Sequence, residues 1–204
     1  MDHFDGLVQP QPMIREAIIT TLNADGAPHL TPLGYRMIGD EVLLAPFIPS
    51  RTLDNLRRCP AAVLNFTDDV RIIAGCLTGR GDWPTRPALR GPVPRLADAL
   101  AHWELAVVAV VEDAERPQFR CAIVARAVHG EFTGFSRAQS AVLEAAILVS
   151  RLDRLAPAKV AQELRYLQGA IDKTAGPREQ LAWDWLLAAV QAHAQQPSHA
   201  ADAP

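Results

Sequence analysis

The spacing of hydrophobic positions changes about two thirds of the way along the chain. From Met13 to Phe132, short runs rich in Val, Ile, Thr, Leu and Phe are separated by Gly, Pro and Asp, a pattern typical of strands joined by turns. After Phe132 the apolar residues recur at helical spacing. The pattern predicts an α+β protein with a β domain over residues 1–133, helices over 134–194 and a disordered polar tail over 195–204.

The β region begins with a predicted antiparallel hairpin. Residues 14–22 and 27–38 flank Asn23-Ala24-Asp25-Gly26, and glycine readily adopts the positive φ that such a connection needs. A short helix is predicted over 51–58, with Ser50 as its cap. Further strands are predicted over residues 41–45, 61–67, 103–112 and 119–132.

Three amphipathic helices are predicted in the last third of the chain. Ser136 followed three residues later by Gln139 is a capping-box pattern, which marks the start of the first helix. Pro157 and Pro177 suit the first turns of the other two. Because short loops join these helices, we expect a small antiparallel bundle packed on the β domain.

Residues 79–95 interrupt the strand pattern with four prolines and four arginines. Prolines oppose regular strand pairing, so this segment is predicted to be a long surface loop. A loop of this length is either a functional lid or disordered. Its arginines either attract an acidic substrate or a phosphorylated cofactor, or form a solvated rim; they are Arg80, Arg86, Arg90 and Arg95.

The composition is that of a globular protein with no strongly charged partner. The 204 residues have a formal net charge of −3, with 49% hydrophobic and 21% charged residues, and no dense Lys/Arg run. Binding to nucleic acid or to an anionic membrane is therefore not expected. No apolar stretch approaches the ~20 residues of a membrane span, and the first six residues do not resemble a secretory signal. We expect a cytoplasmic protein.

Several kinds of chemistry are not supported by the sequence. There is no GxGxxG after a strand and no GxxxxGK[ST], the motifs that hold nucleotide phosphates. His102-Trp-Glu104 and His129-Gly-Glu131 have the H-x-E form of zinc deaminases but lack the Pro-Cys-x-x-Cys partner. The cysteines form no CxxC pair and are expected to be reduced thiols; they are Cys59, Cys76 and Cys121. No metal site is predicted.

Ser136 also admits a hydrolase interpretation. It lies where a strand gives way to a helix, as in a nucleophile elbow, and Asp172 or Asp184 followed by His193 has the chain order of a triad. The second glycine of the elbow is replaced by Ala138, and helix capping already explains the serine. A serine hydrolase is therefore the least favoured function.

The strongest candidate site is the segment 49–56, between two predicted strands. A helix starting here directs its unpaired N–H groups and positive dipole end outward, and Arg51 and Thr52 add a cation and a hydroxyl. These residues favour a monophosphate site. The alternative is an ordinary capped helix with a solvated arginine.

Four motifs follow one another in an order that is difficult to obtain by chance. They are Ile18-Ile-Thr-Thr-Leu-Asn-x-Asp-Gly-x-Pro-His29, Thr31-Pro-Leu-Gly34, Arg51-Thr-x-x-Asn-Leu56 and Val63-Leu-Asn-Phe-Thr-Asp-Asp69. Together they resemble the FMN-binding split-barrel superfamily, which includes pyridoxamine-phosphate oxidase and flavin reductases. The chain is more closely similar to an uncharacterised family of such flavoproteins from archaea and methylotrophic bacteria, in which a helical segment like residues 134–152 and 172–176 follows the barrel.

The resemblance implies a six-stranded antiparallel FMN-binding split β-barrel with a C-terminal three-helix appendage, and a homodimer with FMN at the subunit interface. Transferred to this sequence, the phosphate is held by Arg51, Thr52 and Asn55. The backbone of Thr31, Pro32, Leu33 and Gly34 lies along the isoalloxazine ring, and Asn65 and Thr67 border it. Thr20 and Thr21, on the neighbouring strand, can supply a hydroxyl there, although strand propensity alone also explains both threonines.

The function implied is an FMN-dependent oxidoreductase that acts on a small organic substrate or on another flavin-type cofactor. The alternative is a flavin-binding carrier or sensor that does not turn over. No catalytic residue is predicted, since a flavin carries this kind of chemistry itself.

Overall fold

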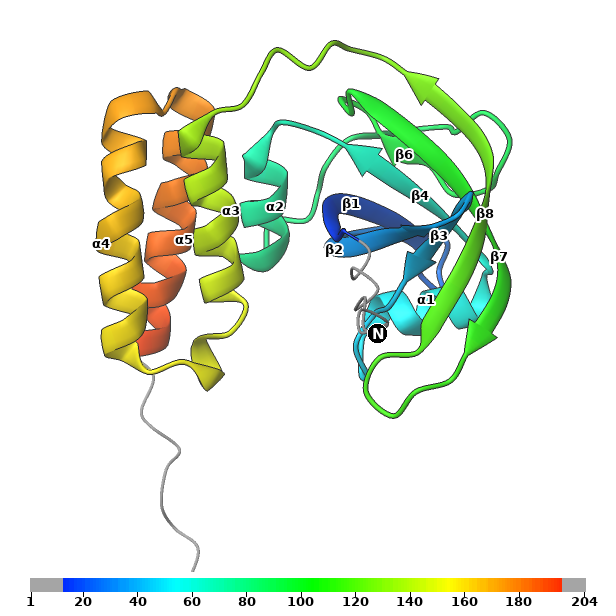
Figure 1. Ribbon diagram of the computed structural model, residues 1–204, viewed down its shortest axis with the longest axis horizontal. Helices are drawn as coiled ribbons and strands as arrows, with labels where there is room; N and C mark the ends of the chain where they lie inside the picture. The colour runs from blue at the N-terminus through cyan, green and yellow to red at the C-terminus, as the bar shows by residue number, and fades with distance from the viewer. Residues whose placement is uncertain (1–12, 196–204) are drawn as a thin grey trace, which may run out of the picture. The chain divides into compact units, whose positions relative to one another are not determined.

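The computed structural model describes residues 13–195 (Figure 1). The segment in which no secretory signal was found and most of the predicted tail, residues 196–204, lie outside the described residues. The chain divides into two compact units. The first contains the chain up to Asn65 together with 87–95 and 102–127, and the second contains 66–86, 96–101 and the chain from Val128 onward.

Six antiparallel strands close into a barrel in the order β1-β2-β3-β8-β7-β4 (Figure 1). The predicted split barrel is confirmed. Closure pairs each of these six strands on both sides, so the barrel itself has no exposed edge. The strands are β1 (Arg15–Leu22), β2 (Pro28–Ile38), β3 (Glu41–Leu44), β4 (Ala61–Phe66), β7 (Ala101–Val111) and β8 (Gln118–Val128).

The predicted hairpin is formed by β1 and β2. Gly26 has φ +83° in the connection, and the N–H of Asn23 donates to the carbonyl of Ala27 at 2.8 Å. Strand β8 ends at Val128, whereas the sequence predicted a strand to Phe132. The strand ends early because the N–H groups of His129 and Gly130 both donate to the carbonyl of Leu100.

Helix α1 (Arg51–Arg58) connects β3 to β4 and lies across one end of the barrel (Figure 1). Its bounds and its Ser50 cap are those predicted, since the Ser50 hydroxyl accepts the N–H of Leu53 at 3.3 Å. The buried residues recur at helical spacing and form one face, which is made of Thr52, Leu53, Asn55 and Leu56.

The second unit contains four helices that lie side by side in Figure 1: α2 (Val70–Leu77), α3 (Arg137–Val149), α4 (Pro157–Thr174) and α5 (Pro177–Gln195). A short 3-10 helix, Leu152–Arg154, follows α3. The three predicted helices are present, and Ser136 caps α3 as expected. Helix α2 was not predicted; it packs against α3 and α5. None of the helices in residues 13–195 is both long and apolar enough to cross a membrane.

The loop between α2 and β7 is described along its whole length. It contains two short strands, β5 (Thr85–Arg86) and β6 (Arg95–Leu96), which pair with each other. The expectation that prolines prevent pairing here is wrong at this one place, because Pro84, Pro87 and Pro94 flank the paired residues instead of occupying them.

Candidate functional site

The first turn of α1 offers unpaired backbone donors beside a cation. The Ser50 hydroxyl and carbonyl accept the N–H groups of Leu53 and Asp54, at 3.3 and 3.2 Å. The N–H groups of Arg51 and Thr52 come earlier and have no intrahelical acceptor. Arg51 is exposed and Thr52 is buried. With the positive end of the helix dipole, these groups can hold a phosphate-sized anion.

Asn55 joins α1 to the β1–β2 hairpin. Its amide donates to Thr21 Oγ1 at 3.0 Å and to Asn23 Oδ1 at 3.2 Å, and its oxygen accepts from Arg58 at 3.0 Å. Arg58 also donates to the carbonyl of Leu22. Asn55 and Thr21, both predicted as cofactor residues, are thus buried and bonded to each other, and they fix the position of the helix.

Strand β1 lies between two predicted ring-binding segments. Ile18 is opposite Pro32 on β2 and opposite Asn65 on β4. The Asn65 amide is fully buried and donates to the Ile18 carbonyl at 3.0 Å and to Thr20 Oγ1 at 2.9 Å. The backbone of Thr31, Leu33 and Gly34 continues along the same edge of β1, opposite Ile19, Ala17 and Glu16.

Gly34 has no room for a side chain. A Cβ at this position would lie 2.9 Å from Cγ2 of Ile14, closer than carbon atoms normally approach. A glycine in a strand often marks a place where another group approaches the backbone closely. In this structure that group is the Ile14 side chain.

Thr67 is the one predicted cofactor residue that lies in the second unit. Its hydroxyl accepts the N–H of Asp69 at 3.1 Å, in the turn that leads to α2. The structure gathers the other nine residues on α1, β1, β2 and β4 of the first unit.

His29 belongs to this cluster, although no role was predicted for it. It lies directly opposite Thr21 in the β1–β2 ladder. Its pKa is below the usual histidine value because of partial burial and because of the nearby positive charge of Arg51. The only sequence signal was its place at the end of the first motif.

Glu104 forms a second cluster in the first unit. Its carboxylate is 1% exposed and accepts the backbone N–H groups of Leu89 at 2.5 Å, Arg90 at 3.0 Å and Gly91 at 2.7 Å. His102 Nε2 lies 3.4 Å from the same carboxylate. Burial acts to raise the Glu104 pKa, but the hydrogen bonds from Gly91, Leu89, Arg90 and His102 outweigh it and hold the pKa below its usual value. The loop of residues 79–95, which we call the Pro/Arg loop, is therefore fixed to β7 by the charged carboxylate of Glu104.

The H-x-E motifs gather no metal ligands. No cluster of three or more His, Cys, Asp or Glu side chains suited to a metal occurs among residues 13–195. The oxygens of Glu104 are already bonded to the loop.

The hydrolase triad is not assembled. The Ser136 hydroxyl accepts the N–H of Gln139 at the start of α3. His193 lies 3.8 Å from Asp153, which follows the other end of α3. A 13-residue helix separates the two ends by about 20 Å, so His193 cannot reach Ser136.

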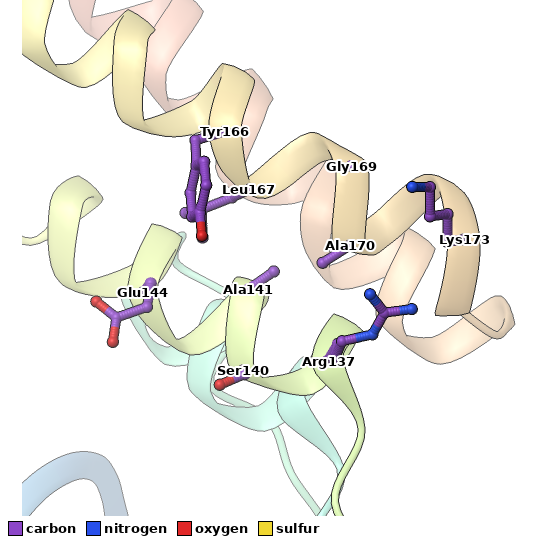
Figure 2. A pocket seen from close by; sticks show the side chains of 9 residues that line it. All are labelled: Arg137, Ser140, Ala141, Glu144, Tyr166, Leu167, Gly169, Ala170 and Lys173. Carbon is purple, nitrogen blue, oxygen red and sulfur yellow. The ribbon is translucent and has the colours of Figure 1, made fainter.

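A groove of about 440 Å³ lies between α3 and α4 in the second unit (Figure 2). Arg137 and Lys173 lie at one end and Tyr166 lies toward the other. None of its lining residues belongs to the predicted cofactor set; they are Arg137, Ser140, Ala141, Glu144, Tyr166, Leu167, Gly169, Ala170 and Lys173.

The closed six-stranded barrel, with a helix between its third and fourth strands, has the architecture of the FMN-binding split-barrel proteins, so the predicted fold class is confirmed. Within that class, the chain belongs to the family described as protein of unknown function DUF447. Its N-terminal domain matches residues 15–130 and its second domain matches residues 136–188.

Solved structures show the same fold. The FMN-bound DUF447 protein MM1853 from Methanosarcina mazei superposes with a TM-score of 0.75 at 18% identity, over 88% of this chain and 96% of that one. The 2-nitrobenzoate 2-nitroreductase NbaA of Pseudomonas fluorescens superposes with a TM-score of 0.50 at 24% identity, over 61% and 68%. Component B of nitrilotriacetate monooxygenase from Mycobacterium thermoresistibile superposes with a TM-score of 0.51 at 18% identity, over 59% of this chain and 72% of that one. No curated protein matches the chain.

Proposed function

We propose that this protein is an FMN-binding flavoprotein that acts as a homodimeric oxidoreductase. The observation that carries the proposal is the first turn of α1, where Arg51, Thr52 and two backbone N–H groups stand at the positive end of a helix that Asn55 bonds to β1. The fold is shared with an FMN-bound member of the same family. Bound FMN would supply hydride and electron transfer, which this chain's side chains do not provide.

The residues present fit the two ends of such a cofactor. Arg51 and Thr52 would contact the phosphate, while the backbone of Thr31–Gly34 would follow the ring. Asn55, Thr21 and Asn65 already have protein partners, so we assign them to positioning α1 and β1. Thr67 belongs to the second unit, so its role beside the ring stays a prediction from the sequence and is not used in this proposal.

Substitution of Arg51 tests the cofactor site. Arg51→Ala removes a charge-assisted contact, so FMN affinity should fall by about one to two orders of magnitude, or roughly 1.5 to 3 kcal/mol. The matched control is Arg57→Ala, which removes the same charge from the same helix, where Arg57 pairs with Glu112 at 2.8 Å. A fluorescence titration with FMN measures both variants.

Riboflavin, which lacks the phosphate, completes this test. Its affinity should be the same in Arg51→Ala and in the parent protein. If Arg51→Ala and Arg57→Ala bind FMN equally well, the phosphate site is not at α1. If the parent protein binds neither flavin, the proposed function is wrong.

Exposed valines on β7 and β8 support the homodimer. Val108, Val110 and Val124 are 54%, 43% and 41% exposed, and apolar side chains on a strand face favour contact with a partner. Val108→Asp should convert a dimer into a monomer in light-scattering measurements. Leu181→Asp, at an equally apolar and 41% exposed position on α5, should leave the dimer intact. A parent protein that is monomeric at all concentrations would contradict the dimer.

Turnover distinguishes an oxidoreductase from a flavin carrier. With FMN bound, NADH or NADPH oxidation should exceed the rate of the same concentration of free FMN. No excess with either donor would favour the carrier or sensor.

A further inference from the structure

We infer that His29 is a second phosphate-binding residue of this site, and that it takes up a proton when a phosphorylated flavin binds. The inference rests on the proposed function, since it concerns the same site. It predicts that the affinity for FMN depends on pH through His29, whereas the affinity for riboflavin does not.

The geometry follows from strand pairing, one hydrogen bond and helix spacing. His29 and Thr21 are directly opposite each other, so their side chains project from the same face of the hairpin. Thr21 Oγ1 accepts from the Asn55 amide at 3.0 Å. Asn55 and Arg51 are four residues apart on α1 and therefore share a helix face. The imidazole thus lies on the side of the hairpin where Arg51 begins the helix.

Charge supports this arrangement. Arg51 is near enough to disfavour protonation of His29, and partial burial acts in the same direction, so the pKa of the free protein is lowered. A phosphate dianion beside both groups reverses the sign of the local potential. The bound state therefore favours the imidazolium, which can donate a second charge-assisted hydrogen bond.

The other cations on the adjoining elements have different partners or lie farther away, and the acidic residue in the first turn of α1 is Asp54. On α1, Arg57 pairs with Glu112, and Arg58 bonds to Asn55 and Leu22. In the turn, Asp25 accepts the N–H of Ala27 at 2.9 Å. Arg15 and Glu16 are at the opposite end of β1, and Arg36 is near the far end of β2. Arg51 is the cation that faces His29.

The sign of the effect follows by linkage. The free protein holds His29 neutral near pH 7, and binding raises its pKa, so binding consumes protons. FMN affinity should therefore rise as the pH falls from about 8.5 to 6.5, where a phosphate monoester is still largely a dianion. We expect an increase of about fivefold.

The experiment compares FMN and riboflavin binding by fluorescence at pH 8.5, 7.5 and 6.5. His29→Gln keeps a hydrogen-bond donor but does not titrate, so its FMN affinity should be nearly independent of pH. His193→Gln is the matched control, since His193 lies on α5 beside Asp153. Calorimetry of the parent protein in two buffers of different ionisation enthalpy counts the protons directly, and needs no variant.

Proton uptake with FMN but not with riboflavin, together with a flat profile for His29→Gln alone, is the expected result. The inference is overturned if FMN binds without proton uptake, or if His29→Gln keeps the parent pH profile. It is also overturned if riboflavin shows the same dependence on His29. If neither flavin binds the parent protein, the proposed function fails and this inference fails with it. FMN binding without a pH effect contradicts only the inference.

Discussion

The Glu104 carboxylate accepts the backbone N–H of Gly91 at 2.7 Å across thirteen residues of chain. A Cβ on Gly91 would lie 3.3 Å from the same oxygen, so the absence of a side chain allows this close approach. Two further N–H groups, of Leu89 and Arg90, point at the carboxylate. One buried anion therefore holds three successive residues of the Pro/Arg loop, Leu89, Arg90 and Gly91.

Glu104→Gln should release this part of the loop. The amide keeps one acceptor but turns an NH₂ group toward backbone donors, so we expect a loss of about 1.5 to 3 kcal/mol in unfolding free energy, measured in urea. Glu112→Gln, an exposed carboxylate paired with Arg57, is the control and should change stability by less than about 1 kcal/mol. Trypsin should also cleave after the exposed Arg90 faster in Glu104→Gln. Equal stability and cleavage in both variants would show that the carboxylate does not hold the loop.

The same contact predicts a pH dependence. Because the folded state lowers the Glu104 pKa, its contribution to stability is complete above the unfolded-state pKa, near 4.5, and is lost as the pH falls through the lower folded-state pKa. The stability difference between the parent protein and Glu104→Gln should therefore be constant from pH 7 to about 5.5 and shrink in more acidic solution. Urea titrations at pH 7, 5.5, 4.5 and 3.5 measure it. A difference that grows on acidification would contradict the assignment.

Asn65 should contribute strongly to the stability of the barrel. Its buried amide bonds β4 to the Ile18 carbonyl and the Thr20 hydroxyl, so Asn65→Ala leaves buried polar groups without their partner and should lower stability by about 2 to 4 kcal/mol. Asn23→Ala, which removes one partly buried acceptor, should have a smaller effect of about 1 kcal/mol. Urea unfolding of the two variants measures the difference, and equal losses would contradict the role given to Asn65.

Two glycines in the helical unit should respond oppositely to alanine. At Gly75 a Cβ would lie 2.7 Å from Cζ2 of Trp83 and 2.9 Å from the Arg80 carbonyl, so Gly75→Ala should destabilise by about 1 to 3 kcal/mol. At Gly169, in α4, no atom other than those of its chain neighbours and of the backbone of its own helix lies within 4 Å of the added carbon. Gly169→Ala should therefore stabilise by about 0.5 to 1 kcal/mol. Thermal unfolding of both variants checks the signs, and a shift in the same direction for both would be evidence against this packing.

The parts of the fold that sequence analysis predicted are those determined by local chemistry. Asn23–Gly26 dictates a turn, Ser50 and Ser136 cap helices, and Pro157 and Pro177 begin them. Closure of the barrel was predicted only from the resemblance to a family. No local pattern contains that information, since it depends on pairing between distant strands.

The parts that were missed depend on tertiary structure. Val70–Leu77 is apolar at nearly every position and only eight residues long, so periodicity does not distinguish it from a buried strand. Its one local signal was Asp69, whose side chain accepts the N–H of Arg71 at 3.1 Å. The Glu104 contact could not be predicted because its partners are backbone N–H groups, and the spacing of side chains along the sequence does not indicate them.

The sequence predicted which elements carry the candidate residues, but not which of these residues contact one another. Arg51 and Thr52 stand at the helix start, where the motif placed them. That Asn55 bonds to Thr21 instead of facing outward could be known only from the register of β1 and the position of α1. His29 gains its relation to Arg51 through the same pairing.

Helix α2 belongs to the second unit, although it lies in the sequence between two barrel strands, β4 and β7. It leaves the barrel after β4, packs on α3 and α5, and is followed by a loop that returns to β7. Its buried face includes Val70, Ile72, Ile73 and Ala74. A chain ending before α3 would expose these side chains to water while every barrel strand was still present. Shortened versions of this protein should therefore aggregate, and during synthesis the apolar face of α2 would stay exposed until the last helices emerge from the ribosome.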